Sequence, residues 1–521
     1  MQAKGNLNRT HWILMAIIAF SALLLLCVLT AHFLRWNAPL PLDAEVGNFR
    51  AYCEDECISL HWENPSAKDF VGTQLMISCE STGYRQTISL EKWEESYTFT
   101  AGEHGKLYAF QLSVRRKNDG ISTGITDTAL FLDMKQLPNL PVLNIETHSG
   151  KDPACEQATN SVGGWGASVT NNEYEPSRLT LRDGEITTYN GVCSIKVRGN
   201  TSALLEKKPY SLELQTATNL MDITDTNGAH TQWNLLPKGT SLTEMVGHLV
   251  AELCGSQWQP KCRYVNLILN GDWKGLYMLF ESVTVSDNRC SLSESGFLIE
   301  NDAYWWNEEG PSFALSTQEQ HPLKFTFQYP RDKALTEEVV LRVQKYMSAF
   351  TEALCNDKPE YQHYIDMEAC AGWLLTHTIM GTYDGGGSNM FWYKPDYIPT
   401  DPLSTKLVMG PAWDFDSSFI CKEEPRVVQS NINYCADLLQ QESFRKAYAQ
   451  QWRRIGPVLT ESVAAKIDEI KNQQGVAIEQ SRQLDAARWG TDVVSIEAET
   501  ATMLDWFSAK TQWLNEKTSE W

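Results

Sequence analysis

The periodicity of the sequence changes near residue 137, and this change constrains the fold most strongly. Before it, short segments of alternating polar and apolar residues follow one another, separated by turn residues and without a helical stretch. These segments are Cys57–Trp62, Gln74–Ser78, Ser96–Thr100 and Tyr108–Val114. Alternation with a period of two is typical of half-buried strands, and short strands at this spacing indicate an antiparallel sandwich. We therefore expect an all-β domain over residues 39–133.

An apolar run precedes this domain. Trp12–Phe33 contains no charged side chain, and a helix of this length, with a rise of about 1.5 Å per residue, spans the hydrocarbon core of a bilayer. Lys4 and Arg9 lie before it, which favours a cytoplasmic N-terminus over residues 1–11. A cleaved signal peptide is the alternative, but the run is long for an h-region and no clear A-x-A site follows. We expect an uncleaved, single-pass transmembrane signal anchor over residues 12–33, with the bulk of the chain extracytoplasmic.

The net charge limits the classes of binding partner, and the cysteine content bears on the redox state of the cellular compartment. The formal net charge is −21, which argues against nucleic acid as a partner because phosphate binding requires clustered Lys and Arg. Of the 13 cysteines, Cys27 lies in the apolar run, so that an even number remains for disulfides in an oxidising compartment. Reduced, buried cysteines are an equally good interpretation. No C-x2-C pair occurs, so we expect no thiolate zinc site.

The predicted sandwich resembles a fibronectin type III module. Trp62 lies in the strand LHWENP, and Tyr108 is placed like the tyrosine of the corner between the E and F strands. Such modules mostly act as spacers or bind other molecules, and the segment contains no catalytic constellation. We expect a spacer between the membrane and the domain that follows.

After Leu137, strands and helices mix. Asn270-Gly271 lies between two strand-like runs and is the strongest short signal for a hairpin. A helix is expected over Ser241–Leu253, with Thr240 or Ser241 as N-cap and Glu244 as the capping-box partner. Further helices are expected at Thr336–Leu354, Asp366–Met380, Ser443–Ile455, Leu459–Gln473 and Ile496–Lys517. Strands first and helices later predict a two-lobed α+β domain over residues 138–521, with a ligand bound between the lobes.

Two acidic clusters lie in the second half of this domain. Asp384 is followed five residues later by Asn389, and the strand-like Leu407–Met409 leads into Asp414–Asp416. This is the order of parts used in protein-kinase phosphoryl transfer, where one Asp orients the substrate hydroxyl while an Asn and a second Asp hold magnesium. Two surface loops made of ordinary turn residues are the alternative interpretation.

Further motifs resemble the spore-coat protein H (CotH) kinase-like family over roughly Leu140 to Trp521. Besides the acidic clusters, the matching segments are RGNTS (Arg198–Ser202), KKPY (Lys207–Tyr210), VNLILNGDWKGLYMLFESV (Val265–Val283), FLIENDAYW (Phe297–Trp305), YPRDKALTEE (Tyr329–Glu338) and GPAWDFD (Gly410–Asp416). The resemblance implies an atypical protein-kinase-like domain that uses ATP and Mg²⁺, or Mn²⁺, to phosphorylate proteins. The expected fold class is thus multidomain: an N-terminal transmembrane helix, a fibronectin III-like sandwich, and an α+β two-lobed kinase-like domain.

The resemblance also implies roles for basic and polar residues. Lys207 is the expected nucleotide-binding and catalytic lysine, preferred over Lys208, which faces the opposite side if this segment is a strand. Arg198 and Asn200 are expected to donate to phosphate oxygens, the alternative being a turn that only joins strands. Glu281 ends the hairpin and is either part of the hinge that passes the adenine or an exposed carboxylate.

The resemblance also implies roles for the residues of the two acidic clusters. Asp384 is the expected base, Asn389 and Asp414 are the expected magnesium ligands, and Asp416 is either a further ligand or the cap of a turn. The sequence departs from the protein-kinase pattern because it has no G-x-G-x-x-G loop. Gly163–Gly166 is the candidate for covering the phosphates in its place.

The leading prediction is an ATP- and Mg-dependent atypical protein kinase acting on Ser/Thr hydroxyls of proteins in the cell envelope or outside the cell. The alternative is a catalytically inactive CotH-like protein that serves surface binding or adhesion. A hydrolase using Asp414 and Asp416 fits less well, because no partner acid is evident.

Overall fold

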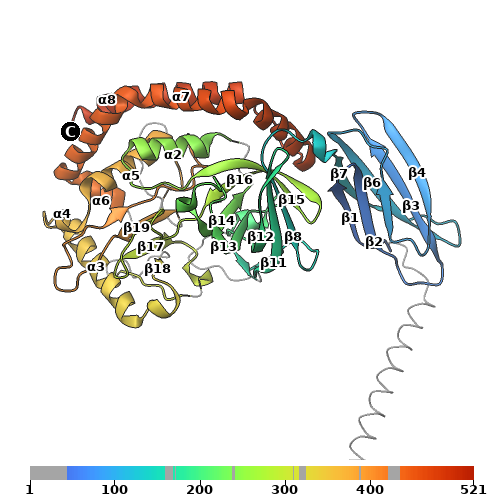
Figure 1. The fold of residues 1–521 in the computed structure, drawn as a ribbon, viewed down its shortest axis with the longest axis horizontal. Coiled ribbons are helices and arrows are strands. Elements are labelled where there is room, and N and C mark those ends of the chain that lie inside the picture. Colours follow the sequence, from blue (N-terminus) through green and yellow to red (C-terminus); the bar gives the residue numbers. More distant parts are fainter. Residues whose placement is uncertain are drawn as a thin grey trace, which may run out of the picture. The chain divides into compact units, whose positions relative to one another are not determined.

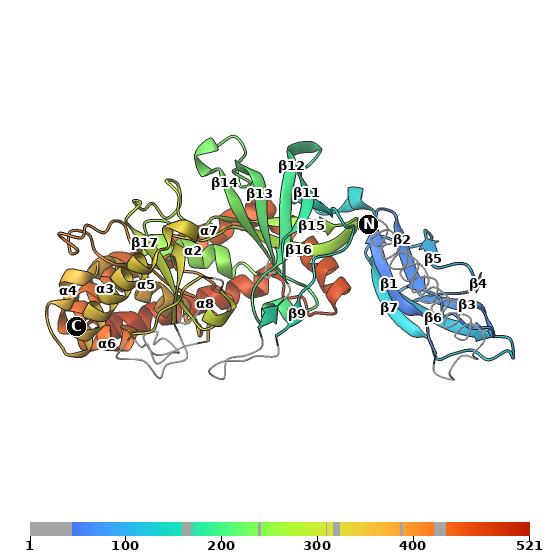
Figure 2. The same cartoon turned by 90° about the horizontal axis from the view of Figure 1, so that it is seen from below.

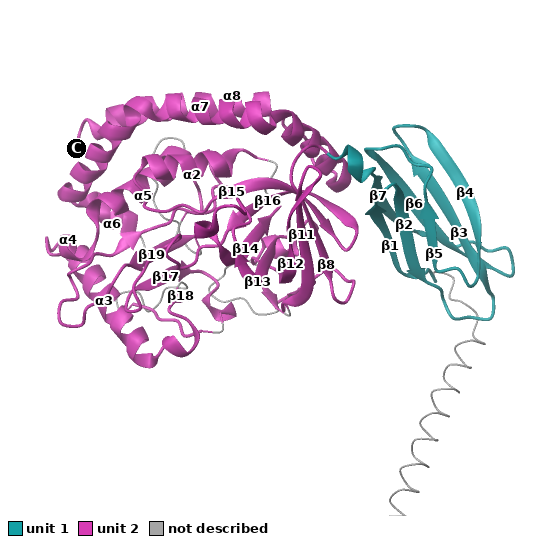
Figure 3. Cartoon of the chain, viewed as in Figure 1, with its two compact units in different colours: residues 1–137 teal, residues 138–521 magenta. Residues whose placement is uncertain are grey.

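The computed structural model describes residues 44–158, 168–170, 172–237, 241–308, 310–315, 324–385, 389–420 and 434–521. The chain divides into two compact units, Met1–Leu137 and Pro138–Trp521, which Figure 3 shows in different colours.

The membrane-anchor prediction is corrected here. No helix within the described ranges is long and apolar enough to cross a membrane. The longest, α7 (Glu442–Trp489), carries charged side chains along its whole length. This finding stands against the predicted transmembrane helix, the signal anchor and the single-pass localisation, which we withdraw. The predicted span Trp12–Phe33 itself lies outside the described residues.

The first unit is a sandwich of two antiparallel sheets. One sheet contains β1 (Gly47–Glu54), β2 (Cys57–Glu63) and β5 (Ser96–Phe99); the other contains β4 (Tyr84–Glu91), β3 (Phe70–Cys79), β6 (Lys106–Arg116) and β7 (Ile125–Phe131), in that spatial order. The predicted strands fall on β2, β3, β5 and β6. Trp62 and Tyr108 are buried in its core, and the Tyr108 hydroxyl accepts a hydrogen bond from the Glu103 N–H (3.1 Å). This contact is the one a tyrosine corner makes in such sandwiches.

The second unit begins with a closed barrel. Its strands, in spatial order, are β11 (Glu175–Asp183), β12 (Ile186–Val197), β13 (Tyr210–Thr218), β14 (His230–Leu236), β16 (Asp272–Glu281), β15 (Cys262–Leu269) and β8 (Val142–Thr147). Between β15 and β16, Asn270 and Gly271 have φ values of 53° and 82°, the two left-handed residues that a type I′ hairpin turn requires. Trp233 and Tyr277 are buried in the core that the barrel strands form.

A second sheet and the helices complete this unit. The sheet has the order β18 (Lys324–Tyr329), β17 (Phe297–Asp302), β19 (Met390–Lys394), β20 (Val408–Met409). The helices are α2 (Thr243–Leu253), α3 (Glu337–Cys355), α4 (Tyr361–Tyr364), α5 (Met367–Met380), α6 (Tyr434–Gln440), α7 and α8 (Ile496–Thr518), and a two-stranded ribbon pairs β9 (Glu156–Gln157) with β10 (Val169–Thr170). Figure 2 shows the barrel strands at one end of the unit and α3, α4, α5 and α6 at the other.

Helix α7 joins the two ends of the second unit. The sequence predicted two helices separated near Pro457, but the structure has one helix of 48 residues, about 72 Å long, with Pro457 inside it. A proline removes one backbone hydrogen bond. Here the burial of Trp452, Ile455, Leu459 and Val463 on both sides of it offsets that loss. Helix α7 contacts α5, α6, α2, α8 and β16, and Figure 1 shows it along one side of the unit.

The described cysteines carry free thiols, and most of them are buried. Burial raises the pKa of the Cys254 thiol to about 12, so the thiolate is disfavoured there. The buried thiols, such as that of Cys254, are therefore packing groups of the core.

Candidate active site

The two acidic clusters lie side by side. Helix α5 ends at Gly381, whose φ of 63° provides a left-handed C-cap, and the chain then turns into Asp384. The segment after β20 hydrogen-bonds to this turn along the backbone. The Phe419 N–H donates to the Met380 carbonyl (2.7 Å), and the Ile420 N–H donates to the Gly381 carbonyl (3.1 Å). Two segments that the sequence only places in order are thus one structural site.

Side chains strengthen this junction. The Ser417 hydroxyl donates a short hydrogen bond to the Asp384 carboxylate, and it also accepts from the Asp384 N–H (3.3 Å). The side-chain amide of Asn389 donates to the Asp384 carbonyl (3.2 Å). Asp384 and Asn389 therefore lie together beside the turn that follows Asp414, and Ser417 is a site residue that the sequence analysis missed.

Helix α2 fixes the segment that contains Asp414. Asp414 adopts a φ of 61°, in the left-handed region that Asp tolerates better than most residues. The next side chain, Phe415, is fully buried and packs so tightly on α2 that a Cβ atom at Gly247 would lie 2.4 Å from its ring. The Phe415 N–H donates to Oε2 of Glu244 (3.3 Å).

This contact corrects the capping-box prediction for Glu244. The N-cap of α2 is Leu242, without a side-chain cap of its own, so Glu244 is not the predicted capping-box partner of Ser241. Glu244 does not pair with the motif lysine Lys207 either, because the Lys207 ammonium pairs with Asp485. Glu244 links α2 to the acidic segment at Phe415.

Arg198 is a cation close to this site. Burial lowers the pKa of its guanidinium, while the charges of Asp414 and Glu300 act in the opposite direction. Gly199 follows with a φ of 82°, and a Cβ there would lie 2.4 Å from the Ser202 hydroxyl, so this turn requires glycine. Asn200 lies in the same turn and accepts a hydrogen bond through Oδ1 from the Asn307 amide (3.0 Å).

Glu300 is a second residue that the sequence analysis passed over. It lies in β17, within the quoted segment FLIENDAYW, and Oε2 accepts a hydrogen bond from the Gln328 amide (2.8 Å). Burial, together with the charges of Asp302 and Glu308, raises the pKa of Glu300 well above its usual range. A glutamate directly after the apolar run Phe297–Ile299 was the available signal, but its proximity to Arg198 depends on the tertiary fold.

Lys207 does not join the acidic cluster. Its ammonium lies 2.6 Å from Oδ1 of Asp485 in α7 and also donates to the carbonyl oxygens of Leu276 (2.7 Å) and Pro237 (3.4 Å). The Lys207 side chain is only 13% exposed, and that of Asp485 is 4% exposed. The structure therefore assigns Lys207 to the contact between α7 and the barrel.

Glu281 is placed at the end of β16, as the sequence predicted, but it is not an exposed carboxylate. It is buried, and Oε2 accepts a hydrogen bond from the Lys261 N–H (2.9 Å). Burial raises the pKa of Glu281. Its side chain thus links the last residue of β16 to the backbone just before β15. A hinge role for Glu281 stays a prediction. Gly163–Gly166 lies outside the described residues.

The donor set suits a metal ion that shares its ligands with a substrate. Among the residues described, no group of three or more His, Cys, Asp or Glu side chains is placed to hold a metal ion by itself. Mg²⁺ commonly uses only one or two carboxylates, with phosphate and water oxygens as its other ligands. Asp414 provides a carboxylate oxygen and Asn389 a side-chain amide oxygen. The exposed Asp416 lies two residues after Asp414. The residues present therefore fit Mg²⁺ bound together with a phosphate ligand.

The second unit joins a closed barrel to a half made mostly of helices. Its candidate site has an Asp–Asn pair beside an Asp-Phe-Asp segment. A family model described as CotH kinase protein matches residues 195–514, more than half of the chain, and the chain belongs to this family. It is a kinase-like protein. No curated protein matches the chain.

Solved structures give only weak similarities. The chain is similar to an FN3 domain of human collagen XX, with 11% identity, a TM-score of 0.16 and coverage of 18% of this chain and 99% of that one. It is also similar to the twitchin kinase region from C. elegans, with 10% identity, a TM-score of 0.20 and coverage of 90% and 69%. Both TM-scores are below 0.5, so we draw nothing from either similarity.

Proposed function

We propose that this protein is an atypical protein kinase that transfers the γ-phosphoryl group of ATP, with Mg²⁺ or Mn²⁺, to Ser/Thr hydroxyls of a protein substrate. The observation that carries the proposal is the backbone junction between the Asp384 turn and the segment after Asp414. Phosphoryl transfer depends mainly on positioning and charge stabilisation, and this junction supports the proposal because it keeps the Asp384 turn next to the segment that follows Asp414. Membership of the CotH kinase protein family supports the same reaction.

Each residue of the site has a role in this proposal. Asp384 orients the attacking hydroxyl and accepts its proton, and the hydrogen bond from Ser417 fixes the carboxylate. Asp414 and Asn389 would hold the metal ion, which when bound neutralises charge on the phosphate oxygens. Arg198 donates to those oxygens, because a guanidinium forms charge-assisted hydrogen bonds with phosphate.

Two substitutions test the proposal. Asp384→Ala removes the base, so we expect transfer from radiolabelled ATP to a panel of acceptor proteins to fall about 10²–10⁴-fold, with little change in ATP affinity. Asp414→Asn keeps the shape but removes a metal-binding charge, so both transfer and Mg-dependent ATP affinity should fall. Asp401→Asn is the matched control, because Asp401 is an exposed carboxylate in the loop between β19 and β20.

Two results would overturn the proposal. One is an Asp384→Ala variant that keeps most of its transfer activity. The other is a wild-type protein that neither binds nucleotide nor transfers phosphate, in which case the family fold serves binding alone.

A further inference from the structure

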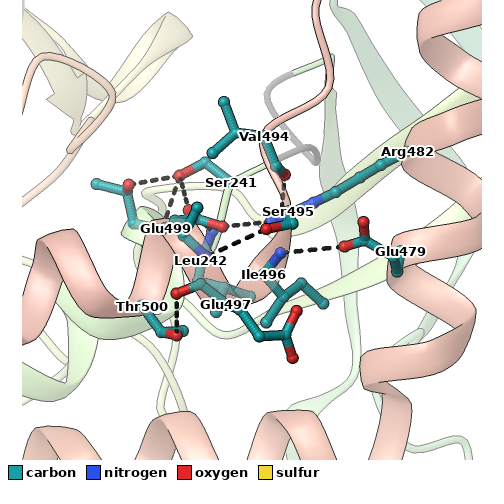
Figure 4. Close-up of polar contacts among 12 residues, drawn as sticks. Ser241, Leu242, Glu479, Arg482, Val494, Ser495, Ile496, Glu497, Glu499 and Thr500 are labelled. Carbon is teal, nitrogen blue, oxygen red and sulfur yellow. Dashed lines mark hydrogen bonds and ion pairs between the residues drawn. The ribbon is translucent and has the colours of Figure 1, made fainter.

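Helix α2, which carries Glu244, is capped by a residue from the far end of the chain. Oε1 of Glu499, in α8, accepts hydrogen bonds from the Leu242 N–H (2.7 Å) and from the Ser241 hydroxyl (2.7 Å), as Figure 4 shows. A carboxylate at a helix N-terminus satisfies unpaired backbone N–H groups and interacts favourably with the helix dipole. The first turn of α2 is therefore set by α8.

Helix α7 holds that carboxylate in place. Nη2 of Arg482 lies 2.6 Å from Oε2 of Glu499, and Nη1 donates to the Val494 carbonyl (3.2 Å) in the connection between the two helices (Figure 4). The side chains of Arg482 and Glu499 are 3% and 13% exposed. A buried charge needs its partner, so neither side chain can leave without disturbing the other.

The cap lies close in the chain to the contact with the candidate active site. Leu242 precedes Glu244 by two residues, and Glu244 accepts the hydrogen bond from the Phe415 N–H. A shift of the first turn of α2 therefore moves the acceptor of Phe415, whose neighbour is Asp414. The barrel supports the same turn, because the Tyr264 hydroxyl donates to the Ser241 carbonyl (2.7 Å).

We infer that Arg482 and Glu499 form a positioning pair for phosphoryl transfer: through the cap of α2 and Glu244 they hold Phe415, and with it Asp414, in place. This inference rests on the proposed function. Neither side chain is among the groups proposed to contact the substrate or the metal ion. Asp485 lies three residues after Arg482 in α7 and accepts from the Leu276 N–H of the barrel (2.9 Å), so this part of α7 contacts both α2's cap and the barrel.

Glu499→Gln tests the pair with little change in shape. The amide still has an oxygen that accepts from Leu242, but the charge facing Arg482 is lost. We expect kcat to fall about tenfold, which corresponds to about 1.4 kcal/mol of activation free energy, with a smaller change in KM for ATP. Glu497→Gln is the matched control, because Glu497 lies in the same turn of α8, 74% exposed and 3.8 Å from Lys471. Adding Arg482→Gln to Glu499→Gln should lower kcat little further, since the two residues act as a unit.

A readout without catalysis separates this inference from the proposed function. Hydrogen exchange at the Phe415 amide and in the first turn of α2 should be faster in Glu499→Gln than in the wild type, and unchanged in Glu497→Gln. If the wild type transfers no phosphate but shows this exchange pattern, the proposed function fails and the link from α8 to Phe415 stands. Unchanged exchange at Phe415, or an equal rise over the whole unit, overturns the positioning role.

Discussion

Arg198 and Lys207 lie in the same connection, between β12 and β13, and the structure gives them opposite surroundings. Lys207 contacts one carboxylate and two carbonyl oxygens, so the three N–H donors of its ammonium match three acceptors of the fold. Arg198 lies in the field of Asp414 and Glu300, at the acidic site. A lysine in a family motif therefore does not by itself predict a ligand-binding residue. Its hydrogen-bond acceptors in the fold must be known first.

The two surroundings also predict different roles for the two side chains: Lys207 in the stability of the fold and Arg198 in ligand binding. A nucleotide phosphate at Lys207 would have to compete with Asp485, and opening a buried ion pair is costly. At Arg198 a phosphate would instead lie close to Asp414, a proposed ligand of Mg²⁺. We therefore expect substitutions at the Lys207 pair to affect folding, and substitutions at Arg198 to affect nucleotide binding.

The largest effect is expected for Asp485→Ala. This change leaves the Lys207 ammonium buried without its carboxylate and removes the acceptor of the Leu276 N–H, so the free energy of unfolding should fall by about 3–5 kcal/mol. Urea denaturation measures this loss. The double variant Lys207→Met/Asp485→Leu should recover a large part of it, because no charge is then left unpaired. A loss below about 1 kcal/mol for Asp485→Ala would mean that Lys207 is available to a ligand.

A smaller effect is expected for Arg198→Met. Charge-assisted hydrogen bonds contribute about 1.5–3 kcal/mol, so the dissociation constant for ATP with Mg²⁺ should rise about 10- to 100-fold, as measured by calorimetry. Lys208→Met is the control, because the Lys208 ammonium donates to the carbonyl oxygens of Ala203 and Leu205. Equal losses of affinity in Arg198→Met and Lys208→Met would remove the distinction between the acidic site and the rest of this connection.

Local signals in the sequence predicted much of the fold. Asn270-Gly271 predicted its hairpin because only a few residues tolerate two left-handed positions. The helix predicted over Asp366–Met380 is α5, and the structure shows Asp366 as its N-cap and Gly381 as its C-cap. The order of the acidic clusters indicated one site, because it matches the order of parts used in protein-kinase phosphoryl transfer.

Contacts between residues far apart in the sequence decide the features that local patterns did not predict. Lys207 points to Asp485 because α7 returns to the barrel 278 positions later in the chain. Glu244 fits a capping-box pattern, yet α8 supplies the cap and frees Glu244 for Phe415. Pro457 suggested a break in a helix that the core holds together on both sides. In each case a tertiary contact outweighs a local propensity.

If the site of Asp384, Asn389 and Asp414 binds ATP with Mg²⁺, the two ligands together should stabilise the protein against thermal unfolding. At a ligand concentration 100 times the dissociation constant, the wild type should gain about 2.7 kcal/mol of stability. Asp414→Asn should lose most of this gain, while the control Asp401→Asn keeps it. No stabilisation of the wild type, or the same stabilisation in Asp414→Asn, would contradict the account.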